Sequence, residues 1–125
     1  MTENEIAKII VDLCFKIHKV LGPELLESVY EEVLVYELKK FGLSFLRQAG
    51  IPVIYESITL DIGFKADIIV VNKIIIELKS VETVLPVHKK QLLTYLKLTE
   101  MKLGLLINFN ENLIKNGIVR IANGL

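Results

Sequence analysis

Residues 63–80, GFKADIIVVNKIIIELKS, decide the fold, because they read as two short strands joined by a tight turn. β-Branched residues dominate both arms, and Asn72 is a turn former between them. Three ionisable residues interrupt the apolar arms, with Asp67 in the first and Glu77 and Lys79 in the second. Side chains alternate faces along a strand, so the pattern predicts Glu77 and Lys79 on one face.

The spacing of these charges suits the chemistry of a divalent cation. Carboxylates on adjacent strands, Asp67 and Glu77, can hold a hard ion such as Mg²⁺ or Mn²⁺, and the carbonyl of Leu78 can add a third oxygen. Lys79 follows Glu77 by roughly 6.5 Å along a strand, within reach of a metal-bound water or a phosphate. Such a site hydrolyses a phosphodiester by making a nucleophile from water and offsetting the developing charge.

A shared metal site imposes a condition on the turn. In an antiparallel pair, a two-residue loop at Asn72 and Lys73 would place Asp67 opposite Leu78, and hence on the other face from Glu77. A three-residue loop or a bulge shifts the parity by one and brings the carboxylates together. The sequence therefore predicts an irregular connection between the two strands.

The alternative is that these residues are ordinary charges at strand ends. Glu77 and Lys79 would then form a weak surface pair with no function. Three charges within arms that are otherwise apolar argue against this, because burying a charge is costly unless it is paired or bound to a metal.

Asp67 followed by Glu77-Leu78-Lys79 resembles the signature of the PD-(D/E)XK nucleases, which include restriction enzymes, Holliday-junction resolvases and repair exonucleases. Three segments more closely resemble the small GxxExxY proteins of that superfamily: LESVY at 26–30, GFKAD at 63–67 and GLLINF at 104–109. The resemblance covers about residues 18–122. One departure is that Glu24 stands where the family name implies glycine, with Gly22-Pro23 left to supply the turn.

The resemblance implies a fold, an activity and roles for four side chains. The fold is a three-layer α/β restriction-endonuclease-like architecture, with a mixed sheet flanked by helices. The activity is metal-dependent hydrolysis of nucleic acid, with Asp67 and Glu77 as metal ligands and Lys79 positioning water. Glu27, on the second predicted helix, is a further candidate for a metal or water ligand.

A helix predicted after the Glu77 strand carries candidate substrate contacts. His88, Gln91 and Tyr95 are spaced at i, i+3 and i+7 and therefore share one helix face. The pair Gln91 and Tyr95 resembles the Gln-x-x-x-Tyr element of exonuclease-type members, which lies beside the active site. His88 and Lys89 belong to the one basic cluster near the site and can receive a phosphate. The alternative is a solvated polar face.

Hydrophobic periodicity and turn residues predict the other elements. They are a capped helix ending at Leu21, a second helix over 23–41, strands over 44–49 and 53–60, a buried strand over 103–109 parallel to the Glu77 strand, and a last strand over 118–121. Arg47 and Gln48 fall on the first of these strands. They are interpreted as exposed charge and polarity that protect a sheet edge, rather than as nucleic-acid contacts.

Length and composition limit the remaining choices. The chain has 125 residues, so residues 1–125 are expected to form one domain. Fifteen basic and fifteen acidic residues cancel, so bulk charge gives no support for nucleic-acid binding. The expected partner is still nucleic acid, DNA in preference to RNA, with a homodimer or partner protein supplying further surface. Hydrophobic residues make up 52% of the chain, which also fits an interface.

Cysteine content and the N-terminal charges bear on location. Cys14 is the single cysteine, which excludes an intramolecular disulfide and favours a reducing compartment. Charged residues interrupt the first apolar run, so no membrane span or secretion signal is predicted, and a cytoplasmic location is expected. Two other functions stay open: an inactive nuclease-fold scaffold that binds protein or nucleic acid, and a purely structural dimerisation module.

Overall fold

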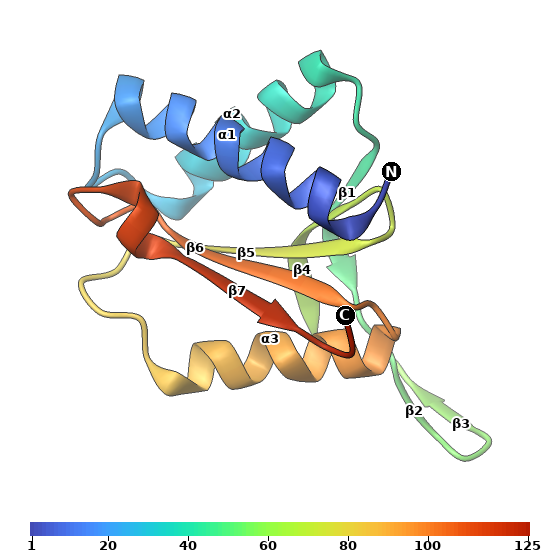
Figure 1. The fold of residues 1–125 in the computed structure, drawn as a ribbon. Coiled ribbons are helices and arrows are strands. Elements are labelled where there is room, and N and C mark those ends of the chain that lie inside the picture. The colour runs from blue at the N-terminus through green and yellow to red at the C-terminus, as the bar shows by residue number, and fades with distance from the viewer.

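The computed structural model describes residues 1–125 as a three-layer α/β fold (Figure 1). Its central layer is a five-stranded sheet in the order β1-β4-β5-β6-β7. Only β5 and β6 run parallel, so the sheet is mixed. The strands are β1 (Phe45–Gly50), β4 (Lys65–Val70), β5 (Ile74–Lys79), β6 (Leu103–Asn108) and β7 (Ile118–Ala122), with a short 3₁₀ helix, η1 (Ile114–Gly117), before β7.

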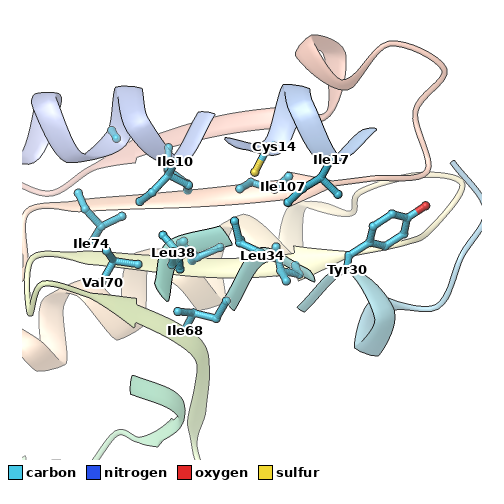
Figure 2. Close-up of a cluster of buried hydrophobic side chains, with 14 of the residues drawn as sticks. Ile10, Cys14, Ile17, Tyr30, Leu34, Leu38, Ile68, Val70, Ile74 and Ile107 are labelled. Carbon is cyan, nitrogen blue, oxygen red and sulfur yellow. The ribbon is translucent and has the colours of Figure 1, made fainter. Parts of the chain in front are cut away.

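Helices cover both faces of this sheet. Helices α1 (Glu3–Leu21) and α2 (Glu27–Phe41) lie on one face, and α3 (Pro86–Thr99) lies on the other (Figure 1). The larger core lies under α1 and α2, where Leu34 and Leu38 meet Ile68 and other sheet residues (Figure 2). A smaller core lies under α3. This confirms the predicted restriction-endonuclease-like fold class, and the alternation of β5 side chains between two cores explains its near-continuous apolar sequence.

The second helix begins later than predicted. Helix α2 starts at Glu27 rather than at Pro23, because Glu24 adopts a left-handed φ of 77° that no helix contains. The buried Tyr30 holds the intervening loop in place: its hydroxyl donates to the Gly22 carbonyl (2.6 Å) and accepts from the Leu25 N–H (3.2 Å). The loop therefore has a fixed shape and carries Glu27 at its end.

Glu24 is the position at which the resemblance to the GxxExxY proteins predicts glycine, and its positive φ is a conformation that glycine adopts readily. Glycine adopts a positive φ without the steric cost that a Cβ incurs. We expect Glu24→Gly to raise the free energy of unfolding by about 1 kcal/mol. Chemical denaturation measures this directly. Glu3→Gly, at the start of α1 where φ is helical, is the matched control and should destabilise; a loss of stability in Glu24→Gly would contradict the prediction.

Residues 53–60 form a hairpin and not the single strand that was predicted. The strands β2 (Val53–Tyr55) and β3 (Ile58–Leu60) pair with each other in a separate two-stranded sheet. The polar residues that looked like interruptions, Glu56 and Ser57, form the turn, and Glu56 has a φ of 52°. The hairpin projects away from the three layers (Figure 1) and leaves Tyr55 65% exposed. The prediction of a single strand failed because strand propensity alone does not indicate where the chain turns back on itself.

Candidate metal-binding active site

The connection between β4 and β5 has the irregularity that a shared metal site requires. Val70 pairs with Ile74, so three residues, Val71 to Lys73, form the loop. Val71 and Asn72 both have positive φ, at 52° and 56°. This confirms the predicted change of parity. In the resulting register, Asp67 lies opposite Glu77.

The two carboxylates meet where the ladder between β4 and β5 ends. The last paired residues are Ile68 and Ile76, and beyond them side chains replace backbone acceptors. The Asp67 N–H donates to Glu77 Oε2 (3.1 Å), and the Leu78 N–H donates to Asp67 Oδ2 (2.8 Å). Each carboxylate thus binds the backbone of the opposite strand. The strands are held at a spacing that keeps the two acids together.

The pair carries more negative charge than its environment favours. Glu77 is only 6% exposed, and burial is the largest cause that raises its pKa to about 8, followed by the charge of Asp67. The nearby Lys79 ammonium acts in the opposite direction. At neutral pH, Glu77 therefore keeps a proton unless a cation takes the proton's place.

This donor set fits a divalent cation with oxygen ligands. Mg²⁺ in enzymes is bound through one or two carboxylates, with waters and substrate phosphate completing its shell. Asp67 and Glu77 provide two carboxylates, and a bound cation would offset the burial and the Asp67 charge that raise the pKa of Glu77. No group of three or more His, Cys, Asp or Glu residues in the chain could hold a metal. The carbonyl of Leu78 stays a predicted further ligand.

Lys79 closes β5 one residue after Leu78. Its backbone is fixed, because its carbonyl accepts the Phe109 N–H (2.9 Å) and it pairs with Asn108 of β6. Its side chain is half-buried and takes part in none of the ion pairs of the structure. The ammonium is close enough to Glu77 to lower that carboxyl's pKa. Lys79 thus carries an ammonium beside the acidic pair on a well-held backbone, and this ammonium forms none of the ion pairs of the structure.

Helix α3 places one of the four candidate substrate residues directly behind the acids. Tyr95 is 4% exposed and packs its ring against Phe64, with centroids 6.1 Å apart. Burial, then the charge of Glu77, raises the pKa of Tyr95, and Asp67 adds to the effect. Glycine at position 104 lets α3 come close, since a Cβ there would lie 2.9 Å from Leu92.

The other three candidates on this helix are less buried than Tyr95. Gln91 is exposed, and His88 accepts the Leu85 N–H through Nδ1 (3.1 Å), which closes the first turn of the helix. Lys89 is exposed. His88 and Tyr95 are seven residues apart, which is close to two full turns, so they lie on nearly the same side of α3, yet Tyr95 is buried and His88 is half-buried.

Glu27 lies near the end of β5 but does not join the acidic pair. Its Oε1 accepts the Ser80 N–H (3.2 Å), and the side chain is exposed. It lines an open depression of about 470 Å³. The lining residues are Glu24, Leu25, Leu26, Glu27, Ser28, Ser80 and Asn110. The late start of α2 explains this position, because Glu27 occupies the first turn of the helix and not its middle.

Glu31, another carboxylate of α2, is linked to Asp67 by hydrogen bonds through Gln48. Glu31 Oε1 accepts from Gln48 Nε2 (2.9 Å), and the same nitrogen donates to Asp67 Oδ1 (3.4 Å). Arg47 also binds Glu31, at 2.9 Å. The interpretation of Arg47 and Gln48 as edge protection missed these contacts. The signal in the sequence was Glu31 itself, one helical turn after Glu27 on the same side of α2.

Comparison with known proteins agrees with this geometry. A family model described as the PD-(D/E)XK nuclease superfamily matches residues 4–121. The chain, with its mixed sheet and paired acids at the split between two strands, therefore belongs to that superfamily, which indicates a nuclease-type function. No curated protein and no solved structure matches the chain. None of its helices combines the length and apolarity needed to cross a membrane.

Proposed function

We propose that the protein is a Mg²⁺- or Mn²⁺-dependent nuclease that hydrolyses phosphodiester bonds in nucleic acid. The observation that carries the proposal is the buried acidic pair, in which Asp67 and Glu77 face each other across the open end of β4 and β5. Two apposed carboxylates in a partly buried site are accommodated by a shared proton or by a bound cation, and the raised pKa of Glu77 reflects this requirement.

Each side chain of the site has a role in this proposal. Asp67 and Glu77 hold the ion, with the Leu78 carbonyl as a further oxygen, and Glu27 assists from the adjacent depression. A bound divalent ion would lower the pKa of a water molecule and offset charge on the phosphate. Lys79 orients the attacking water and stabilises the charge that develops on the phosphate oxygens.

Helix α3 supplies the proposed contacts with the substrate. In this proposal the exposed Lys89 and the half-buried His88, whose Nδ1 is already used at the start of the helix, bind the phosphate backbone, and the exposed Gln91 donates to it. Tyr95, being buried, supports Glu77 from behind. The proposal favours DNA over RNA, membership of the GxxExxY group, a cytoplasmic location and a homodimer that extends the binding surface.

A cleavage assay with lysine variants tests the function. Purified protein is incubated with plasmid DNA, single-stranded oligonucleotides or RNA in Mg²⁺ or Mn²⁺, and Lys79→Met is compared with Lys73→Met. Lys73 is the last residue of the loop before β5, at the end of the strand away from Lys79, and its ammonium donates to the Met1 carbonyl (2.6 Å). We expect Lys79→Met to lower kcat roughly 100-fold or more, and Lys73→Met to be fully active.

Two outcomes would contradict this proposal. Equal activity in the two variants would remove Lys79 from the reaction. Nucleic-acid binding without cleavage of any substrate, in either metal, would favour the inactive scaffold that the same fold could provide.

A further inference from the structure

Gln48 has the backbone conformation of a residue under constraint. It lies within β1, yet its φ is 46°, in the left-handed region that a non-glycine side chain enters at a cost. The register between β1 and β4 places it opposite Asp67, and these two are the one position at which the ladder is interrupted between flanking pairs. The distortion therefore occurs directly beside a proposed metal ligand.

The side chain of Gln48 makes use of this distortion. Its Nε2 donates to Glu31 Oε1 (2.9 Å) and to Asp67 Oδ1 (3.4 Å). The orientation of the amide is unambiguous, because the reversed group would direct its carbonyl oxygen at two carboxylates. The other oxygen of Asp67 accepts the Leu78 N–H (2.8 Å). Both oxygens of Asp67 are thereby held, one by the backbone and one by Gln48.

Glu31 keeps the Gln48 amide in place. Its side chain is 13% exposed and is paired with Arg47 (2.9 Å), which offsets its charge. Arg47 also binds Glu32 (2.8 Å), so the arginine stays anchored without Glu31. Glu31 belongs to no group of three metal-ligating residues. It therefore acts on Asp67 through Gln48.

We propose that Gln48 and Glu31 form a positioning pair that sets the rotamer of Asp67 for metal binding. This inference rests on the proposed function, because it takes Asp67 to be a metal ligand. Partners that orient metal ligands typically contribute 10- to 100-fold to metal affinity. The left-handed φ of Gln48 accompanies an amide that bonds both Glu31 of α2 and Asp67 of β4.

The first test separates strain from function at one position. Gln48→Gly relieves the left-handed backbone but removes the amide, so we expect an unchanged or higher melting temperature together with about tenfold weaker Mn²⁺ binding in calorimetry. Glu56→Gly is the matched control, because Glu56 has a φ of 52° in the hairpin away from the acids. It should gain stability and bind Mn²⁺ as the wild type does. A purely structural role for Gln48 would change the melting temperature and leave the affinity intact.

The second test uses Glu31 and does not depend on how Gln48→Gly folds. Glu31→Gln keeps an oxygen acceptor for Gln48, whereas Glu31→Met removes it. We expect Glu31→Gln to keep its Mn²⁺ affinity within about threefold of wild type, and Glu31→Met to bind Mn²⁺ about tenfold more weakly than wild type. Equal affinity in Glu31→Met and wild type would overturn the positioning pair alone. Failure of the wild type to bind Mn²⁺ would overturn the proposed metal centre, and the pair with it.

Discussion

Replacing Asp67 by Asn is expected to abolish measurable Mg²⁺ and Mn²⁺ binding while leaving the protein folded. The ion would lose one of its two carboxylates, and the loss of a ligand should exceed the 10- to 100-fold effect that is typical of residues that only orient ligands. The fold should survive because an Asn oxygen can still accept the Leu78 N–H that Asp67 Oδ2 accepts now. Calorimetry with Mn²⁺ and a thermal melt on the same sample measure the two effects.

The matched control for this substitution is Asp12→Asn. Asp12 lies on α1, is 63% exposed at its side chain and pairs only with Lys8 (2.8 Å). It carries the same charge change at a surface site, where an exposed pair contributes little. Its Mn²⁺ affinity should equal that of wild type. Saturable Mn²⁺ binding by Asp67→Asn at wild-type affinity would place the ion elsewhere and refute the acidic pair as its site.

Metal-free protein is expected to lose stability as the pH rises from about 5 to about 8. The pKa of Glu77 is raised to about 8 in the folded chain, chiefly by burial and then by the charge of Asp67, from an ordinary value of 4.5. Between these values the unfolded chain has released the proton that the folded chain keeps, so stability is highest below the lower value and declines toward the upper one. The total decrease is about 3 to 5 kcal/mol. Denaturant titrations at a series of pH values measure it.

The variant Glu77→Gln tests whether ionisation of Glu77 causes this pH dependence of stability. The glutamine oxygen can still accept the Asp67 N–H, so the variant retains the contact and loses the ionisation. Its stability should be nearly flat over the same pH range and should exceed that of wild type at about pH 9. Added Mn²⁺ should restore much of the wild-type stability at high pH and have little effect on the variant. A pH dependence in Glu77→Gln as steep as in wild type would assign the decline to other groups.

Local rules predicted most of the fold, and their failures share a cause. The capping box at Thr2 and Glu5, proline in the first turn of α3 and the apolar runs of β5 and β6 all gave correct elements. The start of α2 and the hairpin at 53–60 were wrong. Both errors involve a glutamate with positive φ, at positions 24 and 56, where a residue that favours helix or strand is held in a turn by its surroundings. Propensity carries no information about such positions.

Some features of the candidate site could be predicted from the sequence, and others could not. The acidic pair and even the parity of its loop could be predicted, because strand alternation and metal chemistry together restrict the geometry. The contribution of Gln48 could not be predicted, because it depends on two hydrogen bonds between distant parts of the chain. One joins Gln48 of β1 to Glu31 of α2, 17 positions away, and the other joins Gln48 to Asp67 of β4, 19 positions away. The role of Glu27 also depended on where α2 begins, which the sequence pattern misjudged.

The two acids that face each other at the end of β4 and β5 also restrict how this chain can vary during evolution. Each accepts a backbone N–H from the opposite strand, so a substitution by an aliphatic residue would remove an acceptor from the sheet as well as a proposed metal ligand. Asn and Gln preserve the acceptor. If the proposed metal chemistry is lost in a related chain, amides are therefore expected at positions 67 and 77, and this pair of substitutions would mark inactive relatives.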